Sequence, residues 1–169
     1  MRSDQLGSLV IKEVIKVSKF SSEKIDEVIM GQVLTAGSGQ NPARQAAINS
    51  GIPISKPAYT INQVCGSGLR AVISGYQSIK LGESSNVIAG GQENMSLAPH
   101  SIFYRDERKV SEEKLIDTML NDGLIDAFNH YHMGVTAENI AKKFGISRKE
   151  QDEFALYSQK KTEEALKYN

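Results

Sequence analysis

The sequence predicts an α/β fold that contains a strand–helix–strand unit. Residues 58–64 (AYTINQV) are rich in the β-branched and aromatic residues of strands. Residues 66–81 (GSGLRAVISGYQSIKL) have helical periodicity and end before Gly82, and residues 86–91 (NVIAGG) form another short apolar run. Because a strand, a crossing helix and a further strand usually share one sheet with parallel strands, we expect a parallel sheet.

Three elements are expected before this unit. Residues 4–19 predict an amphipathic helix with Ser3 as its N-cap. The run from Val28 (VIMGQVL) is short, apolar and β-branched, which favours a strand buried on both faces. The pair at 41–42 (NP) is typical of a helix start, and Gly51 ends this short helix. The apolar positions of the first helix are Leu6, Leu9, Val10, Val14 and Val17.

The helix of the strand–helix–strand unit has two different faces. One face carries large apolar side chains and the other carries small side chains. Small residues let a helix backbone approach its neighbours closely, so we expect this helix to be deeply buried between two layers. The large row is Leu69, Val72, Ile73, Tyr76 and Ile79, and the small row is Ser67, Ala71, Ser74, Gly75 and Ser78.

The pattern changes after this unit. At residues 92–130 the periodicity fades, and the charged run 105–114 (RDERKVSEEK) is typical of a solvated face or an oligomer contact. A helix at residues 136–144 follows. Ser147 and Glu150 then form a capping-box pair that begins a last helix.

Composition excludes several kinds of partner. Lys and Arg together number 20, as do Asp and Glu, so no net charge attracts nucleic acid or an anionic membrane. No stretch approaches the roughly 20 apolar residues that span a bilayer. The charged N-terminal segment lacks the pattern of a signal peptide. A lone cysteine cannot form an internal disulfide, so we expect a cytoplasmic location.

Cys65 is the main candidate for chemistry. It follows the predicted strand and precedes Gly66 and Gly68 at the start of the helix. Ligands of parallel α/β sheets gather at the carboxyl ends of the strands, and a helix N-terminus favours the thiolate form of cysteine. The two glycines allow a substrate to approach the backbone closely. These features indicate a nucleophile that accepts an acyl group.

The residues alone leave a second interpretation of Cys65 open. A free cysteine is often a small, buried hydrophobic residue with no chemical role. A metal site is disfavoured, because no second cysteine and no clustered histidines and carboxylates accompany it. A redox role would normally need a resolving cysteine, and the chain has no other.

Several segments run through nearly the whole chain in the order of one known family. They are GQVLTAGSGQNPARQAA, NQVCGSGLRAV, GGQENMSLAP, DGLIDAF and YHMGVTAENIAKKFGISRKEQDEFA. The chain resembles the thiolase family, and within it most of all the acetyl-CoA acetyltransferases. Because several separate motifs occur together, the resemblance is specific.

The resemblance implies a fold that is part of the N-terminal half of a layered αβαβα architecture. Residues 1–91 would be a partial α/β core, and residues 92–169 the incomplete start of the loop region that binds coenzyme A. The family's C-terminal domain would be absent from these residues. A partial sheet exposes apolar edges and faces, so the isolated chain is expected to aggregate or to need a partner.

The resemblance also implies an activity. Cys65 would take the acyl group of one acetyl-CoA as a thioester, and a second acetyl-CoA would attack it to give acetoacetyl-CoA, reversibly. Leu124, His132 and Met133 would line the pocket for the pantetheine end of the substrate, whereas Arg44 would lie near a subunit contact. Coenzyme A thioesters would be the substrates, with no further cofactor and no metal. The family suggests a homo-oligomer, or here a complementing C-terminal half.

Three family motifs do not occur in these 169 residues. They are G-H-P with the activating histidine, N-E-A-F with the oxyanion asparagine, and C-G-G-G with the proton-transferring cysteine. Without a base, the helix N-terminus would still favour acylation of Cys65, but carbon–carbon bond formation would lack a proton acceptor. The chain alone is therefore expected to be inactive in the complete reaction. One alternative is a non-catalytic remnant or interaction module. Another is a ketoacyl synthase-type condensing enzyme that uses carrier-protein thioesters, although H-M-G at 132–134 and NPARQ at 41–45 favour a thiolase.

Overall fold

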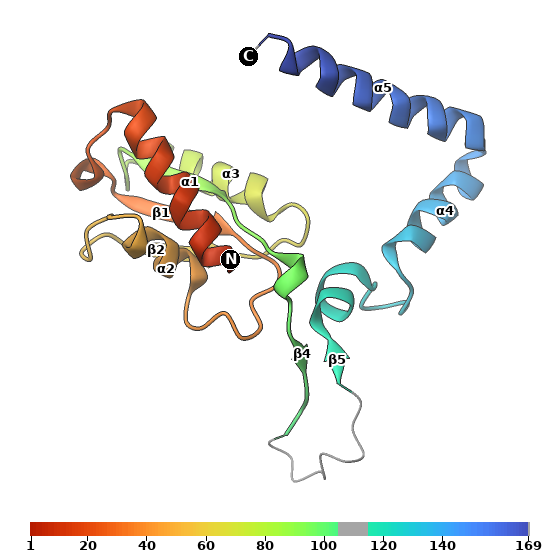
Figure 1. Cartoon of the computed structure of the whole chain (residues 1–169), viewed down its shortest axis with the longest axis horizontal. Coiled ribbons are helices and arrows are strands. Elements are labelled where there is room, and N and C mark those ends of the chain that lie inside the picture. The colour runs from red at the N-terminus through yellow and green to blue at the C-terminus, as the bar shows by residue number, and fades with distance from the viewer. Residues whose placement is uncertain (105–114, 169) are drawn as a thin grey trace. The chain divides into compact units, whose positions relative to one another are not determined.

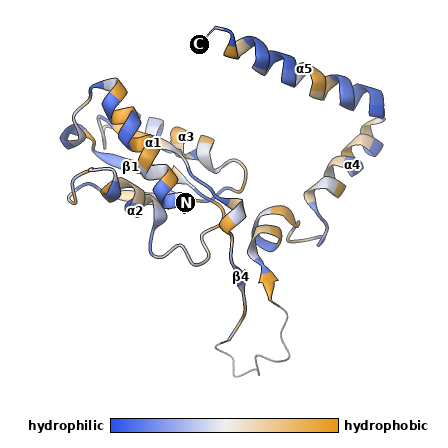
Figure 2. Ribbon diagram, in the orientation of Figure 1, coloured by the Kyte–Doolittle hydropathy of each residue, from blue (hydrophilic) through white to orange (hydrophobic). Residues whose placement is uncertain are grey.

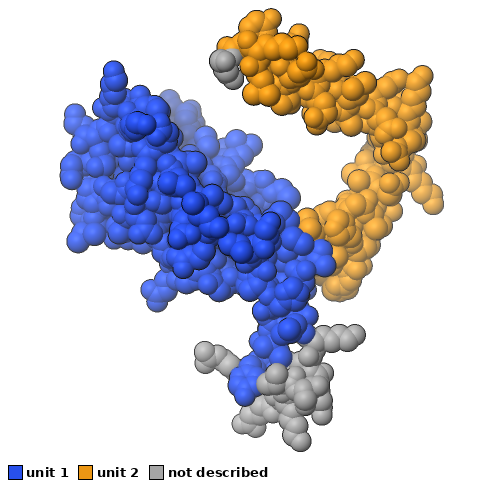
Figure 3. Space-filling view, viewed as in Figure 1, with its two compact units in different colours: residues 1–123 blue, residues 124–169 orange. Residues whose placement is uncertain are grey.

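The computed structural model describes residues 1–104 and 115–168. The chain divides into two compact units, Met1–Gly123 (unit 1) and Leu124–Asn169 (unit 2), which Figure 3 shows in different colours. The charged run 105–114, predicted to be a solvated face or an oligomer contact, lies outside the described residues.

Unit 1 is built on a three-stranded parallel sheet with the strand order β2-β1-β3 (Figure 1). The central strand is β1, in which Val28 pairs with Ala58 on one side and with Ile88 on the other. This arrangement confirms the predicted parallel strands and the buried strand that begins near Val28. The strands are β1 (Glu27–Gly31), β2 (Ala58–Ile61) and β3 (Val87–Gly91).

Helices cover both faces of this sheet. α2 (Pro42–Asn49) connects β1 to β2, and α3 (Ser67–Leu81) connects β2 to β3. The two connections cross the sheet in opposite directions, and such crossovers are right-handed, so α2 and α3 lie on opposite faces. Side chains of β1 alternate between these faces. Val28 and Met30 belong to the core cluster that includes α2, and Ile29 is fully buried on the other side.

The start of α2 agrees with the prediction from the sequence. Asn41 is the N-cap, and its side-chain oxygen accepts the Arg44 N–H at 3.2 Å. Gly51 follows the end of the helix with a φ of 93°, which glycine adopts without strain. The Arg44 guanidinium donates to Ile54 O at 2.6 Å and also to Lys56 O, so it fastens the loop that leads to β2.

The helix α1 (Ser3–Ser18) confirms the predicted first helix, and it lies against α2. The row of large apolar residues that the sequence shows is not the buried face of this helix, which consists of Ser3, Asp4, Gly7, Ser8 and Ile11. A β-carbon at Gly7 would stand 3.3 Å from Ala46 Cβ and would collide with the Gln92 side chain. Gly7 therefore lets the two helices approach closely, and Ile11, which is 1% exposed, belongs to the same core cluster as Ala46. Ser3 is the first helical residue, and Arg2 is the N-cap. The exposed row is Leu6, Leu9, Val10, Val14 and Val17.

The helix α3 is also less buried than predicted. Its small row lies on the sheet, where a β-carbon at Gly75 would stand 3.0 Å from Val87 Cγ1. Because this close contact uses the small residues, the large residues point away from the sheet. Figure 2 shows apolar residues along both α1 and α3. The exposed row of α3 is Leu69, Val72, Ile73, Tyr76 and Ile79.

Unit 1 extends beyond the predicted division after residue 91. Gln92 is buried, and its Nε2 donates to Gln32 Oε1 at 2.9 Å. Thr118 is buried too, and its hydroxyl donates to Pro99 O at 2.6 Å. The Gln92 contact joins this segment to the core of unit 1. The division at residue 91 into a partial α/β core and the family's loop region stays a prediction. The segment contains η2 (Met95–Leu97), the antiparallel pair β4 (His100–Ser101) and β5 (Ile116–Asp117), and the π-helical turn η4 (Leu120–Leu124).

Unit 2 contains two helices. α4 (Met133–Phe144) begins earlier than predicted because His132 serves as its N-cap. α5 (Arg148–Leu166) has the predicted capping box, in which Glu150 Oε2 accepts the Ser147 N–H at 2.7 Å. All described residues of α5 are exposed. Within the described residues, no helix is long and apolar enough to cross a membrane.

Asp26 connects the start of β1 to the segment that leads into β3. Its carboxylate accepts the N–H groups of Ser85 and Asn86 at 2.8 and 2.9 Å, and Lys56 Nζ lies 3.9 Å away. These two backbone hydrogen bonds, together with the weaker effect of Lys56, hold the pKa of Asp26 below its usual value.

Asp26→Asn is expected to lower the free energy of unfolding at neutral pH and to flatten its pH dependence. A carboxylate with a lowered folded-state pKa contributes stability that is complete above its unfolded pKa, about 4, and is lost as pH falls through the folded pKa. Urea midpoints measured from pH 7 down to pH 3 check this. Glu23→Gln, at an exposed site nearby, is the control and should follow the wild type. If the urea midpoints of Asp26→Asn and of the wild type changed with pH in parallel, the stabilising role of the Asp26 carboxylate would be contradicted.

Candidate active site

Cys65 lies in the turn between β2 and α3, at the carboxyl end of the parallel sheet. β2 ends at Ile61, and α3 begins at Ser67 with Gly66 as its N-cap. Cys65 is therefore where parallel α/β sheets bind ligands, in agreement with the prediction. It is exposed, which argues against the alternative of a buried structural thiol.

Val64, directly before Cys65, has an unusual backbone conformation. Its φ is 48°, in the left-handed region. This region is disfavoured for a β-branched residue, and occupying it costs about 1–3 kcal/mol. The turn explains why β2 is shorter than the predicted strand 58–64, because an extended backbone cannot continue through it.

Two side chains hold the backbone around Val64. The Val64 N–H donates to Asn62 Oδ1 at 2.9 Å. The Ser67 hydroxyl donates to Val64 O at 2.6 Å and accepts the Gln63 N–H at 2.8 Å. Both residues were missed at the level of sequence, although Asn and Ser close to a turn often bind backbone groups in this way.

The first turn of α3 lies directly on the ends of two strands. A β-carbon at Gly31, the last residue of β1, would collide with the Ser67 carbonyl carbon and stand 2.6 Å from Gly68 N. A β-carbon at Gly91, the last residue of β3, would stand 3.4 Å from Gly68 Cα. Contacts between backbones therefore set the position of the helix start next to Cys65.

Glu93 holds the loop that follows β1. Its Oε2 accepts the N–H groups of Val33 and Leu34 at 2.8 and 3.2 Å. Its Oε1 is buried and has no hydrogen-bond partner among the described residues. No local sequence pattern indicates this role of Glu93, because the contact joins positions 60 residues apart.

The predicted pocket residues Leu124, His132 and Met133 all belong to unit 2. His132 forms an antiparallel bridge with Ile125, so Leu124 and Met133 flank one bridge and the three residues lie together. His132 is exposed, and its Nδ1 accepts the Gly134 N–H at 3.0 Å. An accepting Nδ1 carries no hydrogen, so Nε2 presents the N–H of the ring. The candidate nucleophile belongs to unit 1.

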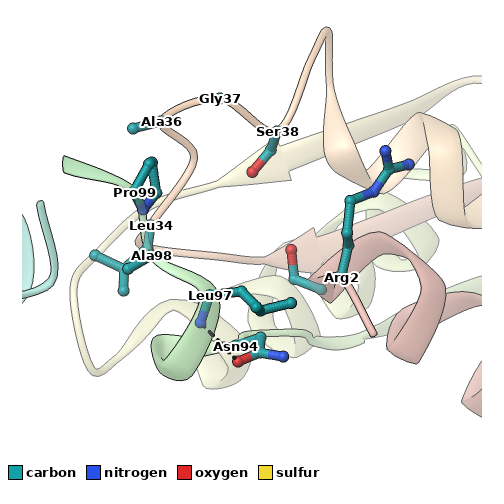
Figure 4. A pocket seen from close by; sticks show the side chains of 10 residues that line it. Arg2, Leu34, Ala36, Gly37, Ser38, Asn94, Leu97, Ala98 and Pro99 are labelled. Carbon is teal, nitrogen blue, oxygen red and sulfur yellow. Dashed lines mark hydrogen bonds between the residues drawn. The ribbon is translucent and has the colours of Figure 1, made fainter. Parts of the chain in front are cut away.

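A separate cavity of about 130 Å³ lies in unit 1 (Figure 4). The start of α1, the loop after β1 and the segment around η2 line it. Arg2 is one lining residue, and its guanidinium binds both carboxylate oxygens of the buried Asp4 at 3.0 Å. Cys65 does not line this cavity. In the part of the chain that the structure describes, no group of three or more His, Cys, Asp and Glu side chains could hold a metal ion.

The parallel sheet and the exposed cysteine between a strand and a helix define an α/β protein with a candidate cysteine nucleophile. A family model described as the N-terminal domain of thiolase matches residues 1–169. The chain belongs to the thiolase family, as its motifs implied. Its mixed α/β fold corresponds to the N-terminal part of the thiolase fold.

Relatives with established names cover nearly the whole chain. The acetyl-CoA acetyltransferase of Cupriavidus necator is 57% identical over 164 residues, which are 96% of this chain and 42% of that protein. A cytosolic acetyl-CoA acetyltransferase of Rattus norvegicus is 54% identical over 162 residues, 96% of this chain and 41% of that protein. The crystal structure of the Acat5 thiolase of Ascaris suum in complex with coenzyme A matches with a TM-score of 0.90 at 40% identity. That match covers 99% of this chain and 44% of the other chain, so this chain spans about two fifths of the relatives.

Proposed function

We propose that this chain contributes the nucleophile of a thiolase-type acyltransferase. The reaction is the reversible conversion of two acetyl-CoA molecules to acetoacetyl-CoA and coenzyme A. The observation that carries the proposal is the exposed Cys65 at the strand-to-helix turn within the C-G-S-G motif. The relatives named acetyl-CoA acetyltransferases and the related structure in complex with coenzyme A support it.

The first half-reaction uses Cys65 directly. Its Sγ attacks the carbonyl carbon of acetyl-CoA, the bond from that carbon to the coenzyme A sulfur breaks, and the thiol proton ends on the released coenzyme A. The product is an acetyl thioester on Cys65. The backbone N–H of Cys65 itself is a suitable donor for the negative oxygen of the tetrahedral intermediate, because the N–H groups of Gly66 and Ser67 already donate to Gln63 O and Val64 O.

The second half-reaction forms the carbon–carbon bond. The α-carbon of a second acetyl-CoA loses a proton and attacks the thioester on Cys65, which releases the sulfur. The motifs that handle this proton in the family, G-H-P and C-G-G-G, do not occur in these 169 residues. We therefore propose that this chain alone carries out only the first half-reaction.

In this proposal, a pocket that the family resemblance assigns to unit 2 receives the pantetheine end of the substrate. Leu124, Met133 and His132 line that pocket, with the Nε2 hydrogen of His132 available to a substrate oxygen. Coenzyme A thioesters are the substrates, and no further cofactor or metal takes part.

A cytoplasmic location and assembly as a homo-oligomer, or with a complementing C-terminal half, belong to the same proposal. The rat relative is named as cytosolic, which supports the location.

Incubation with acetyl-CoA is expected to add one acetyl group to the wild-type chain and none to Cys65→Ser. Serine keeps the size of the side chain but is a far weaker nucleophile without an activating base. Intact-mass spectrometry of both chains measures the result. Equal addition to both would place the acetyl group on other side chains. No addition to the wild type, with the thiol still free, would contradict the proposal for this chain.

A second candidate is a non-catalytic interaction module. The exposed apolar row on α3 favours it, because large contiguous apolar surfaces usually contact another polypeptide. This candidate predicts no acetyl transfer to Cys65, so the same mass measurement separates the two.

A further inference from the structure

We propose that Asn62 and Ser67 are positioning residues for the Cys65 thiol. They act through the backbone of Val64, the residue directly before the nucleophile. The inference rests on the proposed function of Cys65 as acyl acceptor, and it identifies which side chains keep the acceptor in place.

The backbone of Val64 decides the direction in which the chain reaches Cys65. Each residue has only two soft dihedral angles, and together they set the path of the next residue. Val64 has a φ of 48°, which a β-branched side chain disfavours. A Val64 that relaxed to negative φ would send the chain in another direction and would move the thiol with it.

Asn62 and Ser67 bind the peptide groups on both sides of the Val64 α-carbon. On the first side, the Val64 N–H donates to Asn62 Oδ1 at 2.9 Å. On the second side, the hydroxyl and the N–H of Ser67 donate to Val64 O at 2.6 and 3.0 Å. A rotation about φ or ψ of Val64 breaks at least one of these bonds, so the two side chains hold the disfavoured conformation.

Both positioning residues are attached to the sheet. Ser67 is 4% exposed, and its backbone lies against Gly31 at the end of β1. Asn62 Nδ2 donates to Val33 O at 3.4 Å, and the Val33 N–H donates to Glu93 at 2.8 Å. Contacts with the ends of β1 and β3 therefore hold the turn in place. A nucleophile reacts efficiently only when it is held in the correct geometry, so this attachment is consistent with a positioning role.

Three variants of the full chain separate positioning from general stability. Asn62→Ala removes the acceptor of the Val64 N–H, and Asn62→Asp keeps an acceptor oxygen. Gln63→Ala is the matched control in the same turn, because the Gln63 side chain binds Arg70 Nε at 2.7 Å instead of the Val64 backbone. Two rates are measured for Cys65. One is acetylation as a function of acetyl-CoA concentration, and the other is alkylation by iodoacetamide, with the urea-unfolded chain as reference.

Asn62→Ala is expected to lower the limiting rate of acetylation about tenfold while the half-saturating acetyl-CoA concentration stays the same. Its alkylation rate should move to that of the unfolded chain. Asn62→Asp keeps the acceptor of the Val64 N–H but loses the donor to Val33 O, so its rates should fall between those of Asn62→Ala and the wild type. Gln63→Ala should stay near the wild type. Unchanged rates in Asn62→Ala, or equal alkylation of the folded and unfolded wild type, would overturn the proposal. If the wild type is not acetylated but the alkylation rates follow the expected order, the proposed function fails and the positioning role stands.

A further variant covers the case in which Asn62→Ala does not fold. Val64→Gly in the Asn62→Ala background replaces the strained residue with one that adopts positive φ freely. The urea midpoint should then return toward the wild-type value. A double variant that stays unfolded would show that Asn62 does not act through the conformation of Val64, and it would overturn the proposal.

Discussion

Gly31→Ala is expected to destabilise unit 1 and to displace the turn that carries Cys65. The added β-carbon would collide with the Ser67 carbonyl carbon and lie 2.6 Å from Gly68 N, and neither backbone atom can rotate away. Either β1 or the start of α3 must shift, at a cost of about 3 kcal/mol. Urea unfolding measures the stability, and the rate of Cys65 alkylation by iodoacetamide reports the displacement of the turn.

Gly90→Ala provides the matched control for Gly31→Ala. Gly90 lies in the neighbouring strand β3, and a β-carbon there meets only Met30 Sδ at 3.9 Å, an ordinary contact. This variant should unfold near the wild-type midpoint and keep the wild-type alkylation rate. Equal losses of stability in the two variants would contradict the explanation that the close backbone contact between Gly31 and the start of α3 requires glycine.

Leu69→Lys combined with Tyr76→Lys is expected to reduce self-association of the chain without unfolding it. The two side chains are 68% and 61% exposed, so they add little to the burial that stabilises unit 1. Substitutions at such sites usually change the free energy of unfolding by less than about 0.5 kcal/mol. Light scattering as a function of chain concentration measures the association, and urea unfolding measures the stability.

Ala71→Leu tests the opposite face of the same helix. Ala71 is 0% exposed and belongs to the small row that lies on the sheet. A larger side chain there should destabilise unit 1 by about 1–3 kcal/mol, because a packed interior resists added volume. If the double lysine variant unfolds and Ala71→Leu does not, the large row and not the small row faces the sheet.

The order and type of the elements could be predicted from the sequence, because their signals are local. The Asn41 cap of α2 and the Ser147–Glu150 capping box of α5 occur where predicted. The faces of α1 and α3 could not be predicted in the same way. Periodicity shows where the large apolar side chains lie, but the contacts of Gly7 and Gly75 show that small residues make the closest approach.

In the candidate site, too, some features could be predicted from the sequence and others could not. The place of Cys65 follows from a strand, a turn and a helix in succession, which the sequence displays directly. Asn62, Ser67 and Glu93 were missed because their partners are backbone atoms, and a sequence pattern does not show which backbone groups a turn leaves unpaired. The pocket role of Leu124, His132 and Met133 stays a prediction of the family resemblance.

The strand order β2-β1-β3 has a consequence for synthesis of the chain on the ribosome. β1 is made first, yet both of its hydrogen-bonding partners come later, the second ending at Gly91. Until then the nascent chain carries an apolar strand with at least one unpaired edge, the kind of segment that pairs with other chains. Chaperone demand should therefore peak before Gly91 emerges and decline once β3 closes the second edge.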